Sequence, residues 1–350
     1  MNYADAARRA LTSLKDGFIL LAIESSCDET AAAVLNGRRS VLSAAIHTQI
    51  PLHRLYGGVV PEIASRSHAE RIRAVVDEAV TRAGVSVSDI SAVAVANRPG
   101  LVGALLVGVS YAKGLAYALG APLIGVDHLQ GHIAANYLTH GELEPPFVCL
   151  VASGGHSHIL HVRSYSEFEL LAKTRDDAAG EAFDKAARAL GLPYPGGPEL
   201  EKLALDGDAY AYPMRSAFNE SDESDFSFSG LKTAVVNLVH TEAQRGARLN
   251  RADVAASFQR AVVQTLVDKS MRCLERTGES TLVLAGGVSA NAALRAALKR
   301  AAEARGARCF YPEPHYCTDN AAMIGCAGYH RLLQGCADGL ALDAEAEWRL

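Results

Sequence analysis

The sequence has few aromatic residues (6%), no Cys-x-x-Cys pair and no excess of basic charge. A low aromatic share with 30 glycines is typical of an α/β protein with many tight turns. The seven cysteines are odd in number and show no paired spacing, which argues against a disulfide framework and indicates a reducing compartment, so we expect a cytoplasmic protein. A formal net charge of -5 argues against a globally basic nucleic-acid binder but leaves room for a local basic patch or a basic partner.

The chain also lacks the marks of a secretory signal or a membrane anchor. Residues 1–18 mix basic and acidic side chains and contain no long apolar stretch, so we expect a disordered extension. The apolar run 101–120 is interrupted by Lys113 and by three glycines. A helix packed closely on a sheet explains this run better than a membrane span, and we expect no membrane association.

The apolar pattern predicts two similar domains. At 350 residues and 49% hydrophobic composition, the chain is long enough to bury a sizeable core and to divide in two. Buried strands are predicted at 18–23 and 147–152, and each leads through a polar or glycine turn into a second strand, at 31–35 and 156–162. The repeated strand, turn and strand suggests an internal duplication, with two domains related by a pseudo-twofold axis and a cleft between them.

Two turns in the second half carry residue types suited to an anion. Ser153–Gly155 joins two predicted strands, and Gly286–Asn291 leads from a strand at 281–285 into a helix from 292 to 305. Glycine lets successive N–H groups converge on a phosphate, and a helix N-terminus favours the same charge. Each turn taken alone is equally well explained as an ordinary connection.

The segment between these turns is acidic and polar. Thr174–Leu190 has a helical pattern with Asp177, Glu181 and Asp184 on one face, which either complements the helix dipole or places a carboxylate against ribose hydroxyls. Residues 216–230 are rich in serine and aspartate, and we expect an exposed loop there.

A pair of histidines follows the apolar strand predicted at 122–126. His128 and His132 are four residues apart at the start of a helix, so both project from one face, where two imidazoles can hold a metal. Taken alone, the pair is better explained as ordinary polar residues at a helix start. Asp319, beside the predicted helix cap Thr318, is a loop-borne carboxylate able to complete a ligand set.

Taken together, the motifs resemble those of the tRNA threonylcarbamoyladenosine-modifying family, whose bacterial members are the catalytic subunit of the threonylcarbamoyl transfer complex. The resemblance covers about residues 19–335. The ordered series is far more specific than any single motif. It comprises Ile23–Thr30, His128–His132, Val151–His156, Asp177–Lys185, Tyr194–Pro198, Phe226–Lys232, Ala285–Asn291 and Cys317–Asn320.

The resemblance implies a two-domain α/β fold of the actin, Hsp70 and sugar-kinase (ASKHA) type, with duplicated mixed-sheet domains around a nucleotide cleft. The N-terminal lobe would comprise 19–126 plus about 320–350, and the C-terminal lobe 127–319. The implied activity is an acyl transfer that moves the threonylcarbamoyl group of threonylcarbamoyl-AMP to N6 of adenosine 37 in tRNAs reading codons that begin with adenine. The implied partners are a paralogous non-catalytic subunit and a small P-loop ATPase subunit.

The resemblance also implies site residues. One divalent metal per subunit, Fe²⁺ ahead of Zn²⁺, Mn²⁺ or Mg²⁺, would be held by His128, His132 and Asp319. Asp28 and Glu29 are our candidates for deprotonating or orienting the attacking amine. The adenylate-binding positions fall on Val151, Ala152, Ser153, Gly154, Gly155, Asp184, Gly197, Glu201 and Asn291, of which Glu201 replaces a frequent aspartate.

Two further positions depart from the family pattern. Arg98 stands where the family commonly has glycine, and we expect it to alter a turn or to add a phosphate contact. Gln130 replaces a frequent glutamate between the histidines, which weakens any acid–base role for that position.

Three other functions compete with the transferase. A small-molecule kinase of the same fold would use hydrated magnesium between carboxylates and phosphates, and has no need of the His pair. A metalloprotease needs a glutamate directly after its first histidine, where this chain has Leu129. A non-catalytic scaffold paralogue would not be expected to keep His128, His132 and Asp319 together.

Overall fold

The computed structural model describes residues 2–14, 17–37, 39–215, 218, 223–246 and 249–348. The chain forms two compact units: unit 1 comprises Met1–Leu52, Val59–Leu143 and Pro312–Leu350, and unit 2 comprises His53–Gly58 and Glu144–Tyr311. The lobe boundaries expected from the sequence differ from these, because residues 127–143 and 312–319 lie in unit 1 and not with the C-terminal half. The reason is packing, because the helix at His128–Thr139 lies against the helix at Ala321–Leu333, which directly follows residues 312–319.

Unit 1 is built on a five-stranded sheet of order β3-β2-β1-β4-β5. The first three strands form an antiparallel meander, and β4 and β5 continue the sheet parallel to β1. One helix, α1, precedes the meander, and the others come after the meander or after a parallel strand. The strands are β1 Ile19–Glu24, β2 Glu29–Asn36, β3 Val41–Thr48, β4 Ile90–Arg98 and β5 Leu123–Asp127; the helices are α1 Tyr3–Thr12, α2 Ile50–Arg54 at the unit boundary, α3 Pro61–Ala83, η1 Val87–Asp89, α4 Val102–Leu119, α5 His128–Thr139, α12 Pro314–Cys317 and α13 Ala321–Leu333.

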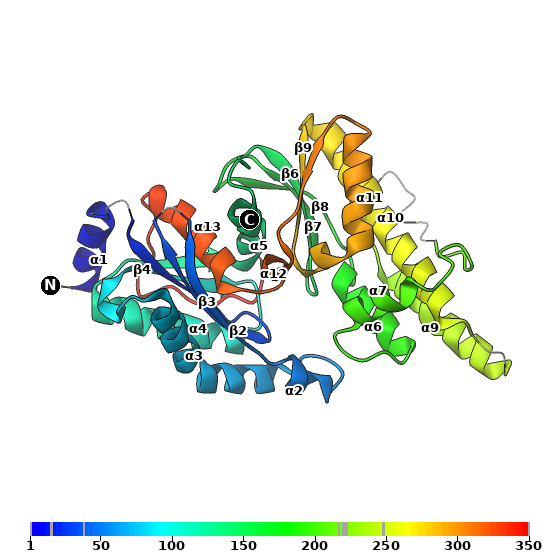
Figure 1. The fold of residues 1–350 in the computed structure, drawn as a ribbon, viewed down its shortest axis with the longest axis horizontal. Helices are drawn as coiled ribbons and strands as arrows, with labels where there is room; N and C mark the ends of the chain where they lie inside the picture. Colours follow the sequence, from blue (N-terminus) through cyan, green and yellow to red (C-terminus); the bar gives the residue numbers. More distant parts are fainter. Residues whose placement is uncertain are drawn as a thin grey trace. The chain divides into compact units, whose positions relative to one another are not determined.

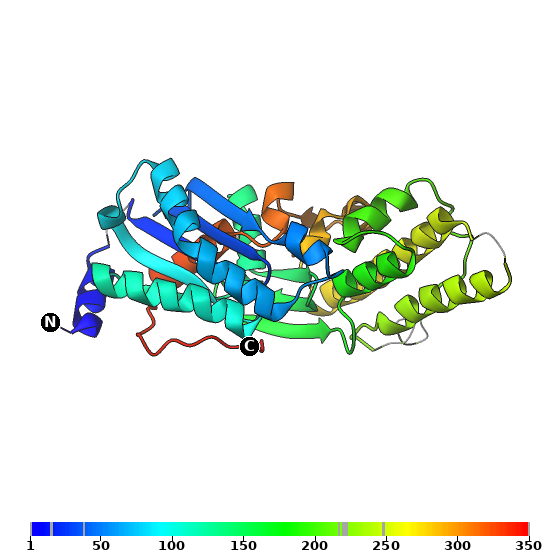
Figure 2. The ribbon, with the colours of Figure 1, turned by 90° about the horizontal axis from the view of Figure 1, so that it is seen from below.

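Helices cover both faces of this sheet (Figure 1). Because side chains alternate along a strand, Leu21 and Ile23 of β1 join one core with α3 and α4, whereas Ala22 faces α13. Figure 2 shows α3 and α4 lying side by side on their face. The central strands β1 and β4 are therefore buried along most of their length, as expected for a sheet covered on both sides, whereas the edge strand β3 alternates between buried and exposed residues.

The N-terminal extension differs from the expected disorder. Residues Tyr3–Thr12 form α1, which Asn2 caps by accepting a hydrogen bond from the Asp5 amide at 2.9 Å. The Tyr3 hydroxyl donates to the Ala121 carbonyl at 2.9 Å, and its ring packs against the core under α3 and α4. The polar composition of residues 1–18 gave no sign of this tertiary contact.

Helix α4 is the apolar run that we expected to pack on the sheet. By length and composition it is the one helix among the described residues that would be able to cross a membrane. Its face through Ala104, Leu105 and Val109 is buried against the sheet, as predicted, while Val102 and Tyr117 are exposed.

Unit 2 repeats the strand pattern of unit 1. Its sheet has the order β10-β9-β6-β7-β8, with an antiparallel meander β6-β7-β8 and two strands parallel to β6. The predicted duplication of mixed-sheet domains is thus confirmed. The strands are β6 Phe147–Ala152, β7 Ser157–Val162, β8 Phe168–Lys173, β9 Thr281–Ala285 and β10 Arg308–Phe310; the helices are α6 Ala179–Ala189, α7 Gly196–Ala204, α9 Ser229–Gln244, α10 Arg251–Thr277, η2 Gly287–Ala290 and α11 Ala292–Glu303.

The exposed loop expected at 216–230 is only partly covered by the structure, since 216–217 and 219–222 lie outside the described residues. Where it is described, the expectation is wrong at its end, because Phe226 and Phe228 are fully buried in the core of unit 2. Phe226 also joins the sheet by a backbone pair with Lys173, so the two aromatic side chains anchor the segment that leads into α9.

Two helical glycines of unit 1 provide opposite tests of its packing. A methyl group on Gly325 of α13 would overlap Leu35 Cδ1 and lie 3.1 Å from Ala22 Cβ, so Gly325→Ala should lower the free energy of unfolding by about 1–3 kcal/mol through overpacking. Gly114 of α4 is exposed with open space around it, and Gly114→Ala should raise that free energy by about 0.5–1 kcal/mol. Urea denaturation measures both, and equal effects would contradict the packing of α13 on the sheet.

Candidate functional site

The histidine pair lies at the N-terminus of α5. Asp127, the last residue of β5, caps the helix by accepting hydrogen bonds from the amides of Leu129 and Gln130 at 2.9 and 3.3 Å. This cap starts the helix at His128, and His132 follows one turn later with the ring centroids 4.6 Å apart. Both side chains are almost completely buried.

Asp319 completes the cluster from the loop before α13. Its Oδ1 lies 3.4 Å from Nε2 of both histidines, and the three side chains offer ligand atoms within 4.8 Å of one another. Helix α5 lies this close to α13 because Gly131 is located between the two histidines. A Cβ at this position would lie 2.8 Å from Ile324 Cδ1 of α13. The sequence motif therefore needs a glycine at this position for a packing reason.

Polar atoms of His132 in this cluster have no hydrogen-bond partner, and coordination to a metal ion would satisfy one of them. Neither ring nitrogen of the buried His132 has a hydrogen-bond partner among the described residues. Buried polar atoms rarely remain unsatisfied, and two imidazoles with one carboxylate are a common donor set for divalent transition metals. The residues thus fit a metal ion, as predicted.

Electrostatics couple the three groups strongly. Burial and the neighbouring His128 lower the pKa of His132, whereas at His128 the attraction of Asp319 and Glu24 overcomes burial and raises the pKa well above its usual value. Burial alone would raise the pKa of Asp319, but both histidines outweigh it and hold the carboxylate ionised. The cluster is thus arranged to stabilise charge in an enclosed place.

Sequence reasoning missed two groups on the other side of His128. Its Nδ1 lies 3.0 Å from Glu24 Oε2 and 3.1 Å from Ser26 Oγ. Glu24 is a carboxylate at the end of a wholly buried strand, and its position there was the signal available in the sequence.

Asp28 lies in the turn between β1 and β2, and Glu29 is the first residue of β2. Glu29 accepts a hydrogen bond from the Thr48 hydroxyl at 2.8 Å. Burial, followed by the charges of Asp28 and Asp319, raises the pKa of Glu29 to about 7. Burial together with Asp28, Asp319 and Glu24 likewise raises the pKa of the Cys27 thiol, so this turn lies within electrostatic reach of Asp319.

Arg98 does not stand free for a phosphate. Its Nε lies 3.5 Å from Asp127 Oδ2 and its guanidinium 3.9 Å from Glu345, so it links the cap of α5 to the C-terminal segment. The backbone of that segment also bonds to β4, since the Glu345 amide donates to the Asn97 carbonyl at 2.9 Å.

The predicted adenylate-binding residues all lie in unit 2, on β6 and the turn after it, on α6 and α7, and directly before α11. Val151 and Ala152 end β6, and the turn Ser153–Gly155 packs on the first turn of α6, where the Gly180 amide donates to the Ser153 carbonyl at 3.1 Å. A Cβ on Gly180 would lie 2.9 Å from the Gly154 amide nitrogen, and one on Gly286 would overlap the Ala152 carbonyl. These glycines therefore allow the starts of α6 and η2 to approach the turn.

The remaining predicted residues lie on α6, on α7 and directly before α11. Asp184 of α6 accepts hydrogen bonds from the amides of Gly196 and Gly197 at 2.7 and 3.2 Å, and burial raises the pKa of its carboxyl. Glu201 of α7 accepts from the Ala292 amide at 2.7 Å, beside Asn291, which caps α11 through the Leu294 amide. These contacts link the Ser153–Gly155 turn to α6, α6 to the start of α7, and α7 to the start of α11.

The other acidic residues of the 174–190 segment have structural partners. Asp177 forms ion pairs with Lys185 and Lys232 at 2.7 and 2.8 Å. Asp176 caps α9 by accepting from the amides of Phe228 and Ser229. These contacts tie the turn before α6 to the start of α9, so Asp177 does not serve as a free carboxylate for a ribose.

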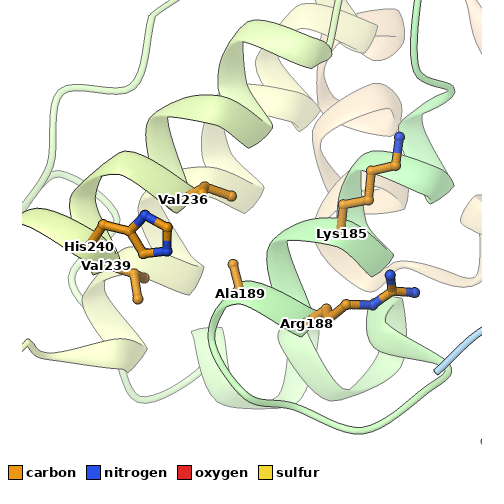
Figure 3. A pocket seen from close by; sticks show the side chains of 6 residues that line it. All are labelled: Lys185, Arg188, Ala189, Val236, Val239 and His240. Carbon is orange, nitrogen blue, oxygen red and sulfur yellow. The ribbon is translucent and has the colours of Figure 1, made fainter. Parts of the chain in front are cut away.

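A pocket of about 260 Å³ lies between α6 and α9 (Figure 3). Its walls are the apolar side chains of Ala189, Val236 and Val239 with His240 at one side. The charged ends of the other two lining residues are engaged elsewhere, Lys185 with Asp177 and Arg188 with the Gly57 carbonyl. None of the six lining residues is a predicted ligand position.

Comparison with known proteins finds one family. The family model described as TsaD, tRNA N6-adenosine threonylcarbamoyltransferase, matches residues 40–326. A protein of that name from Clostridium perfringens is 54% identical over 335 residues, covering 96% of this chain and 99% of its own length. One from Moorella thermoacetica is 55% identical over 325 residues, covering 93% and 95%.

Solved structures with the same fold are much more distant in sequence. HypF from T. kodakarensis superposes with a TM-score of 0.62 at 15% identity, covering 92% of this chain and 48% of that one. Component A of (R)-2-hydroxyglutaryl-CoA dehydratase from Acidaminococcus fermentans gives 0.53 at 14% identity, covering 90% and 99%. They support the ASKHA-type architecture expected from the sequence, and nothing beyond the fold.

The raised pKa of Glu29 predicts a pH-dependent stability. Because the folded protein holds this proton up to about 7, against 4.5 for the free side chain, stability is lost as the pH rises through that window. Glu29→Gln removes the effect, so its melting temperature should exceed that of the wild type at about pH 8 but not at about pH 4. Thermal unfolding at the two pH values measures the difference, with the exposed Glu70→Gln as control; a constant offset would contradict the prediction.

Proposed function

The chain belongs to the tRNA N6-adenosine threonylcarbamoyltransferase family, and on that premise we propose that it transfers the threonylcarbamoyl group of threonylcarbamoyl-AMP to N6 of the tRNA adenosine with the help of a metal ion at His128, His132 and Asp319. The observation that carries the metal proposal is the convergence of two buried histidines and the partly exposed Asp319. The family match favours this transferase over the kinase, metalloprotease and scaffold interpretations.

The metal is proposed to be Fe²⁺. Two imidazoles argue against Mg²⁺, which prefers oxygen ligands, whereas two histidines and one carboxylate leave positions open for substrate and suit ferrous iron. Zn²⁺ and Mn²⁺ remain the competing occupants, and metal analysis of protein purified without oxygen distinguishes them. When bound, such an ion supplies a Lewis acid for a substrate oxygen.

Unit 2 is proposed to hold the adenylate. The amides of Gly154 and Gly155, and that of Ala293 in the first turn of α11, offer N–H groups to the phosphate. Asp184 and Glu201 offer carboxylate oxygens to ribose hydroxyls, for which both would use lone pairs left over from their backbone contacts. The open space around Gly154 and Gly155 leaves room for a ligand to reach these amides.

The transfer itself needs little covalent chemistry from the protein. The N6 nitrogen forms a bond to the carbamoyl carbon, the bond from that carbon to the phosphate oxygen breaks, and AMP leaves with the electron pair. The mixed anhydride is already activated, so positioning and charge stabilisation supply most of the catalysis. The amine proton must pass to a base, for which we propose Glu29 with its pKa raised to about 7, beside Asp28 as an orienting group.

We further propose that the chain works in the cytoplasm with a paralogous partner subunit and a small P-loop ATPase subunit, as the family resemblance implies. None of the seven cysteines, all of which lie in the described part of the chain, forms a disulfide bond, which supports a reducing compartment. The exposed apolar side chains of α4, Val102, Leu106 and Tyr117, support association with another protein.

His132→Ala should abolish the transfer while leaving unit 1 folded. Loss of one imidazole removes the ion and with it several kcal/mol of charge stabilisation, so modification should fall by at least about two orders of magnitude. Mass spectrometry of tRNA nucleosides, with the partner proteins and the adenylate-forming enzyme present, measures the product. His140→Ala, at the far end of the same helix, is the matched control and should retain activity. Wild-type activity in the His132 variant, or undiminished activity after chelation, would refute the metal proposal.

Gly154→Val tests the adenylate site separately. The structure has open space around this glycine, so the folded protein should tolerate the side chain, which would occupy the room proposed for the ligand. The affinity for AMP, measured by calorimetry, should fall at least about tenfold, or about 1.4 kcal/mol. Gly141→Val, at an exposed turn of unit 1 with similar open space, should bind AMP like the wild type. Equal affinity in both variants would place the nucleotide elsewhere.

A further inference from the structure

Unit 1 contains a buried carboxylate that the reaction proposed above does not use. Glu24 ends β1, and its side chain has no exposed surface. A buried carboxylate is costly unless its oxygens are hydrogen-bonded. Oε1 accepts the Ser26 amide at 2.5 Å, and Oε2 lies 3.0 Å from His128 Nδ1.

The second of these contacts determines which nitrogen of His128 carries the proton. A neutral imidazole has one N–H, and an ionised carboxylate can only accept. Glu24 therefore requires the proton on Nδ1, which leaves the lone pair on Nε2. That nitrogen is the one that faces Asp319, at 3.4 Å.

We propose that Glu24 is a positioning residue for the metal site: by accepting the Nδ1–H it holds His128 in the tautomer and ring orientation whose Nε2 binds the ion. The inference rests on the proposed metal at His128, His132 and Asp319 and adds an outer residue to it. Carboxylate partners of this kind orient metal-bound histidines and raise their basicity.

Ser26 cannot perform this role alone. Its hydroxyl lies 3.1 Å from the same Nδ1, but a hydroxyl either donates or accepts and so permits both tautomers. The Ser26 backbone amide, in contrast, fixes Glu24 by binding its other oxygen. The selective group is therefore the carboxylate.

Glu24 also sets the charge of the site. With both histidines neutral, Asp319 and Glu24 contribute one negative charge each, which equals the charge of a divalent cation. In an enclosed site an exact balance avoids an uncompensated buried charge.

Glu24→Gln separates these effects, because the variant keeps the size of the side chain. Its amide can donate to Nδ1 and so favours the proton on Nε2, where it blocks the metal. Titration of the full-length protein with Co²⁺, followed by visible absorption, should show affinity about 10- to 100-fold lower than in the wild type. Glu24→Asp, which retains the charge, should lie between the two. The exposed Glu70→Gln should bind Co²⁺ like the wild type, and Ser26→Ala should lose much less affinity than Glu24→Gln.

A second measurement needs no metal. Because Asp319 and Glu24 raise the pKa of His128, the measurement is made at a pH high enough for its imidazole to be neutral. Nitrogen NMR of ¹⁵N-histidine-labelled, metal-free protein, with His128→Gln to identify the signals, should then show His128 protonated on Nδ1 in the wild type and shifted towards Nε2 protonation in Glu24→Gln. Folding of each variant is checked by its thermal transition, and Glu24→Asp serves if the glutamine variant does not fold.

The outcomes distinguish this inference from the metal proposal. If the wild type binds Co²⁺ and His132→Ala does not, but Glu24→Gln binds as the wild type does, the metal site stands and the role of Glu24 is refuted. If the wild type binds no Co²⁺, the metal proposal fails, and the tautomer measurement decides on its own whether Glu24 orients His128. An unchanged tautomer in Glu24→Gln overturns the inference in either case.

Discussion

The burial of His128 between the carboxylates of Glu24 and Asp319 is the contact on which unit 1 depends. It joins the end of β1, the start of α5 and the loop before α13 at one imidazole. Each of these groups is costly to bury alone, and each lowers the cost of the others, so removing one leaves an uncompensated charge. The packing of α5 on α13 is linked to this contact, because the two helices must lie close together for His132 to reach Asp319 as well. The absence of a Cβ at Gly131 allows this close packing.

The duplicated fold gives the same turn opposite tasks in the two units. Both sheets consist of an antiparallel meander followed by two parallel strands, and in both the connection after the first strand carries residues proposed for the site. In unit 1 this connection is acidic, with Asp28 in the turn and Glu29 at the start of β2, and it lies within electrostatic reach of Asp319. In unit 2 it contains Gly154 and Gly155, whose amides suit an anion. One topology thus presents side-chain oxygens in one copy and backbone N–H groups in the other.

Several glycines are explained by close contacts that exist only in the folded chain. Gly131, Gly180 and Gly286 each stand where another part of the backbone or a core side chain leaves no room for a Cβ. Other polar residues were assigned too freely from local pattern. Asp177 looks available for a ligand in the sequence, but it pairs with Lys185 and Lys232, and the neighbouring Asp176 caps α9. Phe226 and Phe228 are in a polar segment, and only the core of unit 2 explains their burial.

The sequence by itself determined the α/β class, the duplication and the position of each site motif, because apolar runs, glycine turns and the spacing of His128 and His132 are local properties of the chain. The resemblance of its ordered motifs to one family predicted Asp319 as a third ligand and nine adenylate-binding positions. Only the tertiary structure decided which of these residues meet. The lobe boundaries moved because α5 and α13 pack together, α1 formed through the contact of Tyr3 with Ala121, and Glu24 gained its place beside His128. These outcomes depend on pairs of residues about a hundred or more positions apart, whose proximity no local pattern contains.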